Sequence, residues 1–120
     1  MILSRRIFTL GALMVSTVRA SGEENKGMYG LITQILTAPE NRDTVIGCLQ
    51  GGSKAMPGCL SYVVAKDVTH EDAIWVTELW TDKQSHQNSL ALPQVQQTIA
   101  KARPLITGFG TRAETVPLIS

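Results

Sequence analysis

A glutamate, a tryptophan and a histidine close together in this 120-residue sequence are the groups best suited to chemistry. Glu78 and Trp80 stand two positions apart in a predicted strand, so both side chains are expected on one face. His86 follows six residues after Trp80, at the start of a predicted helix. A carboxylate or an imidazole beside an aromatic ring could remove a proton from an aromatic substrate that stacks on that ring.

Each of these three residues also has a purely structural interpretation. Trp80 could be a large core or dimer-interface residue. Glu78 could form an ion pair across the sheet with Arg112 or Lys66. His86 could be an exposed helix histidine, although its ordinary pKa near neutrality makes it the best candidate for a general base.

Other polar residues are predicted to support this site. Tyr62 alternates with Leu60 and Val64 along a strand and could donate a hydrogen bond into a cavity, or be structural. Asn88 and Ser89, which follow His86, could shape the entrance through an amide and a hydroxyl, and Gln34 on the first strand is a weaker candidate.

Metal and phosphate sites are not predicted. His70 lies in a polar turn and is expected to be solvated. The two histidines are distant from each other, and the sequence has no C-x-x-C, H-E-x-x-H, glycine-rich phosphate loop or G-x-S-x-G motif. We therefore expect no metal site.

The elements that must position these residues follow from the apolar pattern. Residues 28–36 read as a strand, and Thr37 with Pro39 and Glu40 resembles a helix start. Pro57-Gly58 is expected to end this helix. The side of the helix that faces the core is expected to carry four residues at helical spacing: Val45, Leu49, Gly52 and Met56. Residues 59–68 and 73–80 read as a hairpin.

A second helix is predicted after the hairpin. Asp82 could cap it, residues 83–91 form its first part, and Pro93 marks a kink or restart. Its apolar stripe is Leu92, Val95, Ile99, Ala102 and Ile106. Residues 109–116 read as the last strand.

The resulting order, β-α-β-β-α-β, predicts a ferredoxin-like α+β fold. Four antiparallel strands would form one sheet, with both helices on one face. The other face would have no cover within the chain, which favours a face-to-face homodimer and leaves a cavity between each sheet and its helices.

Composition limits the classes of protein that this sequence can represent. The length allows a single domain, and 43% hydrophobic residues exclude general disorder. A formal net charge of +1 provides no basic surface for nucleic acid.

The first twenty residues are typical of an export signal. Arg5 and Arg6 precede an apolar segment that is too short for a stable membrane anchor, and Val18-Arg19-Ala20 resembles a cleavage site. Residues 4–11 resemble a twin-arginine signal, and an ordinary secretory signal is the alternative.

We therefore expect a periplasmic or secreted protein, with a flexible leader at 21–27 and a folded domain at 28–120. In an oxidising compartment Cys48 and Cys59 could pair, or they could be two small buried hydrophobic residues.

Three segments carry a resemblance to the antibiotic biosynthesis monooxygenase family, the small dimeric α+β barrels that include quinol monooxygenases. They are residues 57–62, 78–90 and 92–109, and the Glu-x-Trp of Glu78 and Trp80 is the most specific part. The resemblance spans residues 28 to about 116.

The resemblance implies a cofactor-independent oxidation of a quinol or a similar hydroxylated aromatic by dioxygen. Trp80 would stack on the ring, His86 would take the proton, and Tyr62, Glu78 and Asn88 would orient the substrate. A haem-degrading branch of the family uses a histidine further along the second helix, and residues 94–103 contain none. The rival hypothesis is a non-catalytic dimer that binds or sequesters a small apolar molecule.

Overall fold

The computed structural model describes residues 27–118, of which residues 28–115 form one compact unit. The predicted export signal (1–20) and all of the predicted leader except Gly27 lie outside the described residues. Among the helices of residues 27–118, none combines the length and apolar character needed to cross a bilayer.

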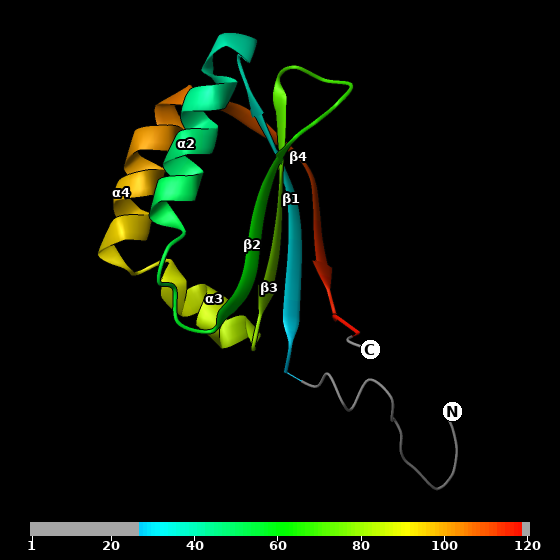
Figure 1. The fold of residues 1–120 in the computed structure, drawn as a ribbon, viewed down its shortest axis with the longest axis vertical. Coiled ribbons are helices and arrows are strands. Elements are labelled where there is room, and N and C mark those ends of the chain that lie inside the picture. Colours follow the sequence, from blue (N-terminus) through cyan, green and yellow to red (C-terminus); the bar gives the residue numbers. More distant parts are fainter. Residues whose placement is uncertain (1–26, 119–120) are drawn as a thin grey trace, which may run out of the picture. The chain divides into compact units, whose positions relative to one another are not determined.

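A single four-stranded sheet forms the centre of the unit (Figure 1). Its strands are β1 (Tyr29–Thr37), β2 (Cys59–Lys66), β3 (Ala73–Trp80) and β4 (Ile106–Thr115). They lie in the order β2-β3-β1-β4, and every neighbouring pair is antiparallel. The predicted ferredoxin-like α+β fold is therefore confirmed.

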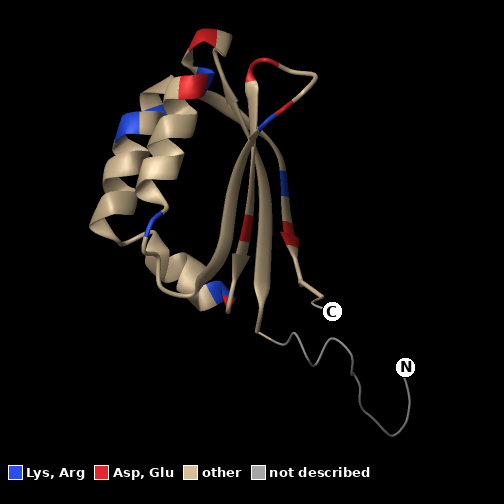
Figure 2. Cartoon of the chain, viewed as in Figure 1, with Lys and Arg blue, Asp and Glu red and all other residues tan. Residues whose placement is uncertain are grey.

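The helices lie on one side of this sheet (Figure 1). Helices α2 (Arg42–Gly52) and α4 (Pro93–Ala102) lie side by side, and the short α3 (Lys83–Ser89) follows the end of β3. Two single 3-10 turns, Pro39–Asn41 and Arg103–Leu105, lead into α2 and out of α4. Charged residues of both signs are dispersed over helices and strands (Figure 2).

Of the residues predicted to begin the two helices, Asp82 acts as a cap and Thr37 does not. The side chain of Asp82 accepts a hydrogen bond from the backbone N–H of Ser85 at 2.6 Å, so the predicted cap of the second helix is confirmed. Thr37 does not cap the first helix. It is buried at the end of β1, and its hydroxyl donates to the carbonyl of Ala38 at 2.8 Å.

Two ends of the predicted apolar stripes are wrong. Helix α2 stops at Gly52, and Met56 reaches the core from the following loop, where Ala55 adopts a left-handed φ of 54°. Ile106 is the first residue of β4, three positions earlier than predicted. In both cases an apolar residue at helical spacing packs against the core from outside the helix, because such packing alone does not fix backbone conformation.

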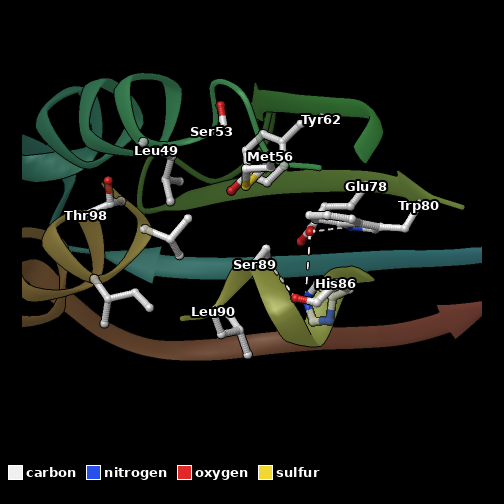
Figure 3. Close-up of a pocket in the computed structure, with 13 residues that line it drawn as sticks. Leu49, Ser53, Met56, Tyr62, Glu78, Trp80, His86, Ser89, Leu90 and Thr98 are labelled. Atoms are coloured by element: carbon white, nitrogen blue, oxygen red, sulfur yellow. Dashed lines mark hydrogen bonds and ion pairs between the residues drawn. The ribbon is translucent and has the colours of Figure 1, made fainter. Parts of the chain in front are cut away.

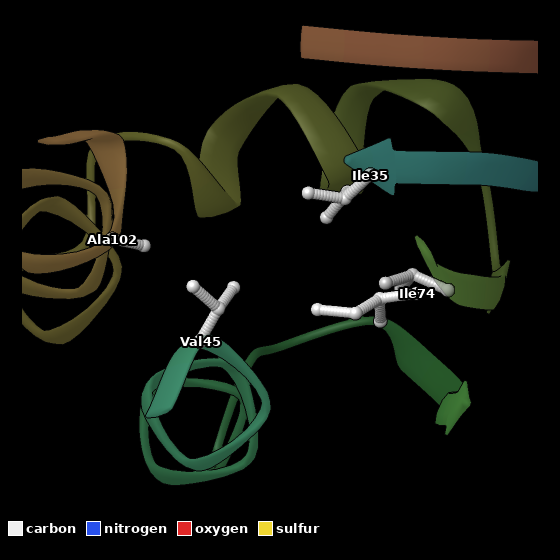
Figure 4. Close-up of a cluster of buried hydrophobic side chains, with 5 residues drawn as sticks. Ile35, Val45, Ile74 and Ala102 are labelled. Atoms are coloured by element: carbon white, nitrogen blue, oxygen red, sulfur yellow. The ribbon is translucent and has the colours of Figure 1, made fainter. Parts of the chain in front are cut away.

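The core lies between the helices and the sheet. One cluster joins β1 and β3 to the two long helices (Figure 4), and its buried members are Ile35, Val45, Ile74, Val76 and Ala102. A second cluster of Tyr29, Leu31, Met56 and Trp80 lies toward the other end of the sheet. Burying a side chain of this size contributes about 1.5–3 kcal/mol, so these clusters hold the helices against the face that carries Glu78.

The opposite face of the sheet has no helix over it within residues 28–115 (Figure 1). The alternation along the strands places Ile32, Val63, Trp75 and Leu79 on this face, and 51% of Val63 is exposed.

Candidate functional site

A pocket of about 140 Å³ lies between the sheet and its helices. A dry cavity of about 150 Å³ is large enough to hold benzene, so the volume suits one aromatic ring. The lining is mainly apolar. Four of its side chains could take part in proton transfer, hydrogen bonding or stacking (Figure 3): Tyr62, Glu78, Trp80 and His86. The structure therefore brings together four of the six residues that sequence reasoning selected for catalysis or substrate binding.

Glu78 and Trp80 are joined directly within the pocket. The indole Nε1–H of Trp80 donates to Oε1 of Glu78 at 3.0 Å, and the Trp80 side chain is fully buried. Burial raises the pKa of the Glu78 carboxyl, while the indole hydrogen bond and the positive charge of Arg112 oppose that rise. Lys66, one of the predicted ion-pair partners, instead pairs with Asp43 at 3.1 Å.

His86 reaches the same pocket from α3. Its Nε2 lies 3.9 Å from Oε1 of Glu78, and only 14% of its side chain is exposed. Its ring stands edge-on to that of Trp80, with ring centroids 5.5 Å apart. The histidine is therefore not the exposed helix residue that the sequence left as an alternative.

The protonation of His86 is set by its surroundings. Burial, followed by the positive charge of Arg112, lowers the pKa of the imidazole, so the neutral form predominates at neutral pH. Its Nδ1 is buried and has no hydrogen-bond partner among residues 27–118. A neutral imidazole next to a carboxylate can accept a proton and have the resulting charge stabilised.

A polar cluster beside His86 ties α3 to the sheet. The hydroxyl of Tyr29 donates to Oε2 of Glu114 at 2.7 Å, and Nζ of Lys83 lies 3.3 Å from the same oxygen. The rings of Tyr29 and His86 are 5.4 Å apart. These contacts fix the first turn of α3 against β1 and β4, and so position His86.

Tyr62 faces Glu78 across the β2–β3 pairing. Burial, with Glu78 and Cys59 adding to it, raises the pKa of the Tyr62 phenol. The hydroxyl therefore stays protonated at neutral pH and is available to donate a hydrogen bond.

Gln34 and Asn88 do not line this pocket. Gln34 pairs with Trp75 and so lies on the opposite face of the sheet, where its Oε1 accepts from the N–H of Thr111 at 3.3 Å. Asn88 lies on the exposed side of α3 and accepts from Gln84 at 2.9 Å. Two helical positions turn a side chain by about 200°, so Asn88 cannot share the direction of His86.

Ser89 and Thr98 also line the pocket: the sequence placed Ser89 near the entrance, whereas Thr98 was not among the predicted site residues. Ser89 is three positions after His86, a spacing that places both on one helix side, and its hydroxyl donates to the His86 carbonyl at 2.6 Å. Thr98 comes from α4, next to Ile99 of the apolar stripe, and its hydroxyl contacts the Cys48 carbonyl at 3.4 Å.

Residues 27–118 contain neither a cluster of metal ligands nor a disulfide bond. No group of three or more His, Cys, Asp or Glu side chains within residues 27–118 is arranged to hold a metal ion. Cys48, on α2, and Cys59, at the start of β2, are both free thiols in the structure.

The sheet order and the largely apolar pocket define the class: a small ferredoxin-like α+β domain with a ligand-sized site between sheet and helices. Residues 28–101 match the family described as antibiotic biosynthesis monooxygenase. The chain belongs to this family.

Solved structures share the fold. A crystal structure from Chloroflexus aurantiacus J-10-fl, named "putative Antibiotic biosynthesis monooxygenase", is 50% identical, with a TM-score of 0.75 over 78% of this chain and 95% of that chain. SnoaB of Streptomyces nogalater, named a cofactor-independent oxygenase, is 14% identical, with a TM-score of 0.63 over 78% of this chain and 96% of that one. The SnoaB likeness concerns the fold alone. Among curated proteins, none matches the chain significantly.

Proposed function

We propose that this protein is a cofactor-independent monooxygenase that oxidises a quinol or a related hydroxylated aromatic with dioxygen. The observation that carries the proposal is the pocket itself, in which the buried carboxylate of Glu78 lies between the indole of Trp80 and the imidazole of His86. Membership of the family and the name of the 50% identical crystal structure support the same reaction class.

The reaction balances without an external reductant. Removing the hydroxyl proton makes the ring electron-rich enough to pass an electron to dioxygen. One oxygen atom then replaces a ring C–H by C=O, and the ring C–O–H becomes a second C=O. The two hydrogens lost leave with the other oxygen atom as water, so the substrate supplies all four electrons that dioxygen takes up.

Each pocket residue has a role in this scheme. Trp80 stacks on the ring, and neutral His86 takes the hydroxyl proton. Glu78, 3.9 Å away, stabilises the imidazolium that forms. The hydroxyl of Tyr62 donates to a substrate oxygen. The apolar lining excludes water from the reduced oxygen intermediate.

The functional unit in this proposal is a homodimer. The uncovered sheet face, which carries Val63 and Leu79, is apolar enough to pair with a second copy of itself. Pairing through that face leaves the pocket on the other side of each sheet accessible to substrate.

We further propose that the protein acts in the periplasm or outside the cell. The sequence features of residues 1–20 support this proposal. Cell fractionation with an antibody to the folded domain tests it, and an exclusively cytoplasmic protein of full length would contradict it.

The decisive experiment is dioxygen uptake by the purified protein with a panel of benzoquinols and naphthoquinols. Spontaneous autoxidation is the background. Trp80→Ala removes the stacking ring, while Trp75→Phe alters the tryptophan of the opposite sheet face. We expect uptake above background that Trp80→Ala abolishes and Trp75→Phe retains.

Two results would overturn the enzymatic proposal. Uptake that never exceeds autoxidation on any compound is one, and uptake that Trp80→Ala leaves unchanged is the other. If quinols nevertheless bind, and Trp80→Ala weakens that binding, the site belongs to a protein that binds or sequesters small aromatic molecules.

A further inference from the structure

A second, larger cavity adjoins the candidate site. Its volume is about 480 Å³, and it lies among β1, α4 and the beginning of β4. Ile35, Ala102, Ile106 and Phe109 supply apolar walls, and Arg103, an exposed residue, is the charged member of the lining. Figure 4 shows the side chains of Ile35 and Ala102 directed toward the same space. The chemistry of these walls suits a hydrocarbon group.

The two cavities adjoin at one end, where three residues line both of them: Leu49, Thr98 and Ile99. Figure 3 shows Leu49 and Thr98 at the end of the first pocket that is remote from Trp80 and His86. A ring whose hydroxyl meets His86 therefore has its opposite edge directed at the second cavity.

We infer that the second cavity holds a hydrocarbon substituent of the aromatic substrate, an inference that rests on the proposed function of the first pocket. The first pocket has room for one ring and no more. The second has more than three times that volume. The substrate class is therefore a phenol or quinol that carries a flexible apolar chain on the side remote from the reacting hydroxyl.

The exposure of Phe109 supports this assignment. This large aromatic residue is 64% exposed on the wall of the second cavity. An apolar hydrocarbon chain in the cavity would remove part of that surface from water, and the burial of apolar area favours binding.

The test is anaerobic binding of 4-methylphenol, 4-butylphenol and 4-octylphenol, measured by equilibrium dialysis. Anaerobic conditions separate binding from turnover. If the chain enters the second cavity, the affinity rises by about fourfold per methylene over the first part of the series and then levels off when the cavity is filled.

Two variants test whether the alkyl chain of the ligand lies in the second cavity. Ile106→Phe fills the second cavity, and Phe109→Ala removes a wall residue that is 64% exposed. Neither residue lines the first pocket. We expect Ile106→Phe to weaken 4-octylphenol binding at least tenfold, Phe109→Ala to weaken it severalfold, and both to leave 4-methylphenol unchanged. Val68→Ala, at a position 98% exposed between β2 and β3, is the matched control.

The outcomes separate this inference from the proposed function. The inference is overturned if the affinity for the alkylphenols does not depend on the length of the alkyl chain. It is also overturned if that dependence is the same in Phe109→Ala as in the natural protein. Neither result affects the oxygen-uptake experiment. The inference is also overturned if none of the phenols binds. The enzymatic proposal is then tested separately by oxygen uptake with unsubstituted quinols. If Ile106→Phe does not fold, Phe109→Ala alone decides.

Discussion

The indole N–H of Trp80 donates a 3.0 Å hydrogen bond to the carboxylate of Glu78, two residues earlier on the same face of β3. This bond opposes the effect of burial on the Glu78 pKa and stabilises the ionised carboxylate. It also fixes the carboxylate next to His86. Trp80 therefore does two things: its ring forms a wall of the pocket, and its nitrogen sets the charge and direction of Glu78.

Replacing Trp80 by phenylalanine separates these two effects. Trp80→Phe keeps an aromatic wall but removes the donor, so the pKa of Glu78 should rise further. A hydrogen bond to a charged group contributes about 1.5–3 kcal/mol, and we expect kcat/KM at neutral pH to fall by about tenfold or more. The acid limb of the pH profile of kcat/KM should move to higher pH.

The control for this change is Trp75→Phe, on the same strand. The nitrogen of Trp75 donates to Oδ2 of Asp67 at 2.7 Å, outside the pocket. Trp75→Phe should lower the thermal midpoint without moving the pH profile. An acid limb that shifts equally in both variants would contradict a specific role for the Trp80 nitrogen.

Glu78→Gln should separate activity from stability. The raised pKa of Glu78 means that the folded state binds its proton more tightly than the unfolded state does. The contribution of Glu78 to stability is then highest below the ordinary pKa near 4.5, and it falls as the pH rises through the pKa of the folded state. Removing the charge should raise the thermal midpoint at pH 7 relative to the natural protein, with the difference vanishing at pH 4.

The same substitution should slow turnover by about 10² or more, because the imidazolium loses its counter-charge. Glu114→Gln is the control. That carboxyl has a lowered pKa, chiefly because the Tyr29 hydroxyl donates to it. Its neutralisation should not raise stability at pH 7, and a thermal midpoint that rises in both variants would assign the effect to net charge.

His86 should give the opposite dependence of stability on pH. Its lowered pKa means that the unfolded chain binds the proton more readily. Its contribution is therefore fully present above about 6.5, the ordinary value, and is lost as pH falls through the folded pKa. Because Glu78 acts in the other direction, the loss is clearest in Glu78→Gln.

Urea unfolding of Glu78→Gln between pH 5 and pH 8 measures this loss. Adding His86→Gln to that variant should flatten the curve between pH 5 and pH 7. A slope that survives the removal of His86 would mean that another group titrates in this range.

The sequence predicted the sheet and its pocket face well because strand alternation is a strict geometric rule. Once β3 was located, Glu78 and Trp80 had to share a face, and the pairing with β2 brought Tyr62 opposite Glu78. The Gln34 prediction failed under the same rule. Its face depends on the register between β1 and β3, where it pairs with Trp75, and a single sequence does not fix that register.

Helix-borne residues were harder to place. The rotation of α3 about its axis decides that His86 and Ser89 face inward while Asn88 faces outward. This short helix, Lys83–Ser89, contains no apolar residue to indicate its inner side. The second cavity also escaped prediction, because it depends on Ile106 starting β4 rather than extending the helix.

A charge on the uncovered sheet face should dissociate the proposed dimer. Val63, 51% exposed on β2, lies on that face, and Val63→Asp would place a carboxylate where two copies meet. We expect sedimentation equilibrium to show a shift from dimer to monomer. Val68→Asp adds the same charge in the exposed β2–β3 turn and should remain dimeric. A natural protein that is monomeric at micromolar concentration would contradict the proposal directly.

Two adjacent glycines in α2 should respond in opposite ways to alanine. A Cβ added at Gly51 meets nothing within 4 Å, so Gly51→Ala should stabilise the protein by about 0.5–1 kcal/mol through helix propensity. A Cβ added at Gly52 would overlap the Thr98 hydroxyl oxygen and lie 2.7 Å from Thr98 Cβ. Rotation of Thr98 cannot relieve the second contact, because Cβ lies on the rotation axis.

Helices α2 and α4 would therefore have to move apart in Gly52→Ala, and overpacking of this kind costs about 1–3 kcal/mol. Urea unfolding of the two variants measures both effects against the same natural protein. Because Gly52 also lines the pocket, the displacement should weaken ring binding in Gly52→Ala and leave it unchanged in Gly51→Ala. Equal stabilisation by both substitutions would show that the two helices do not approach this closely in solution.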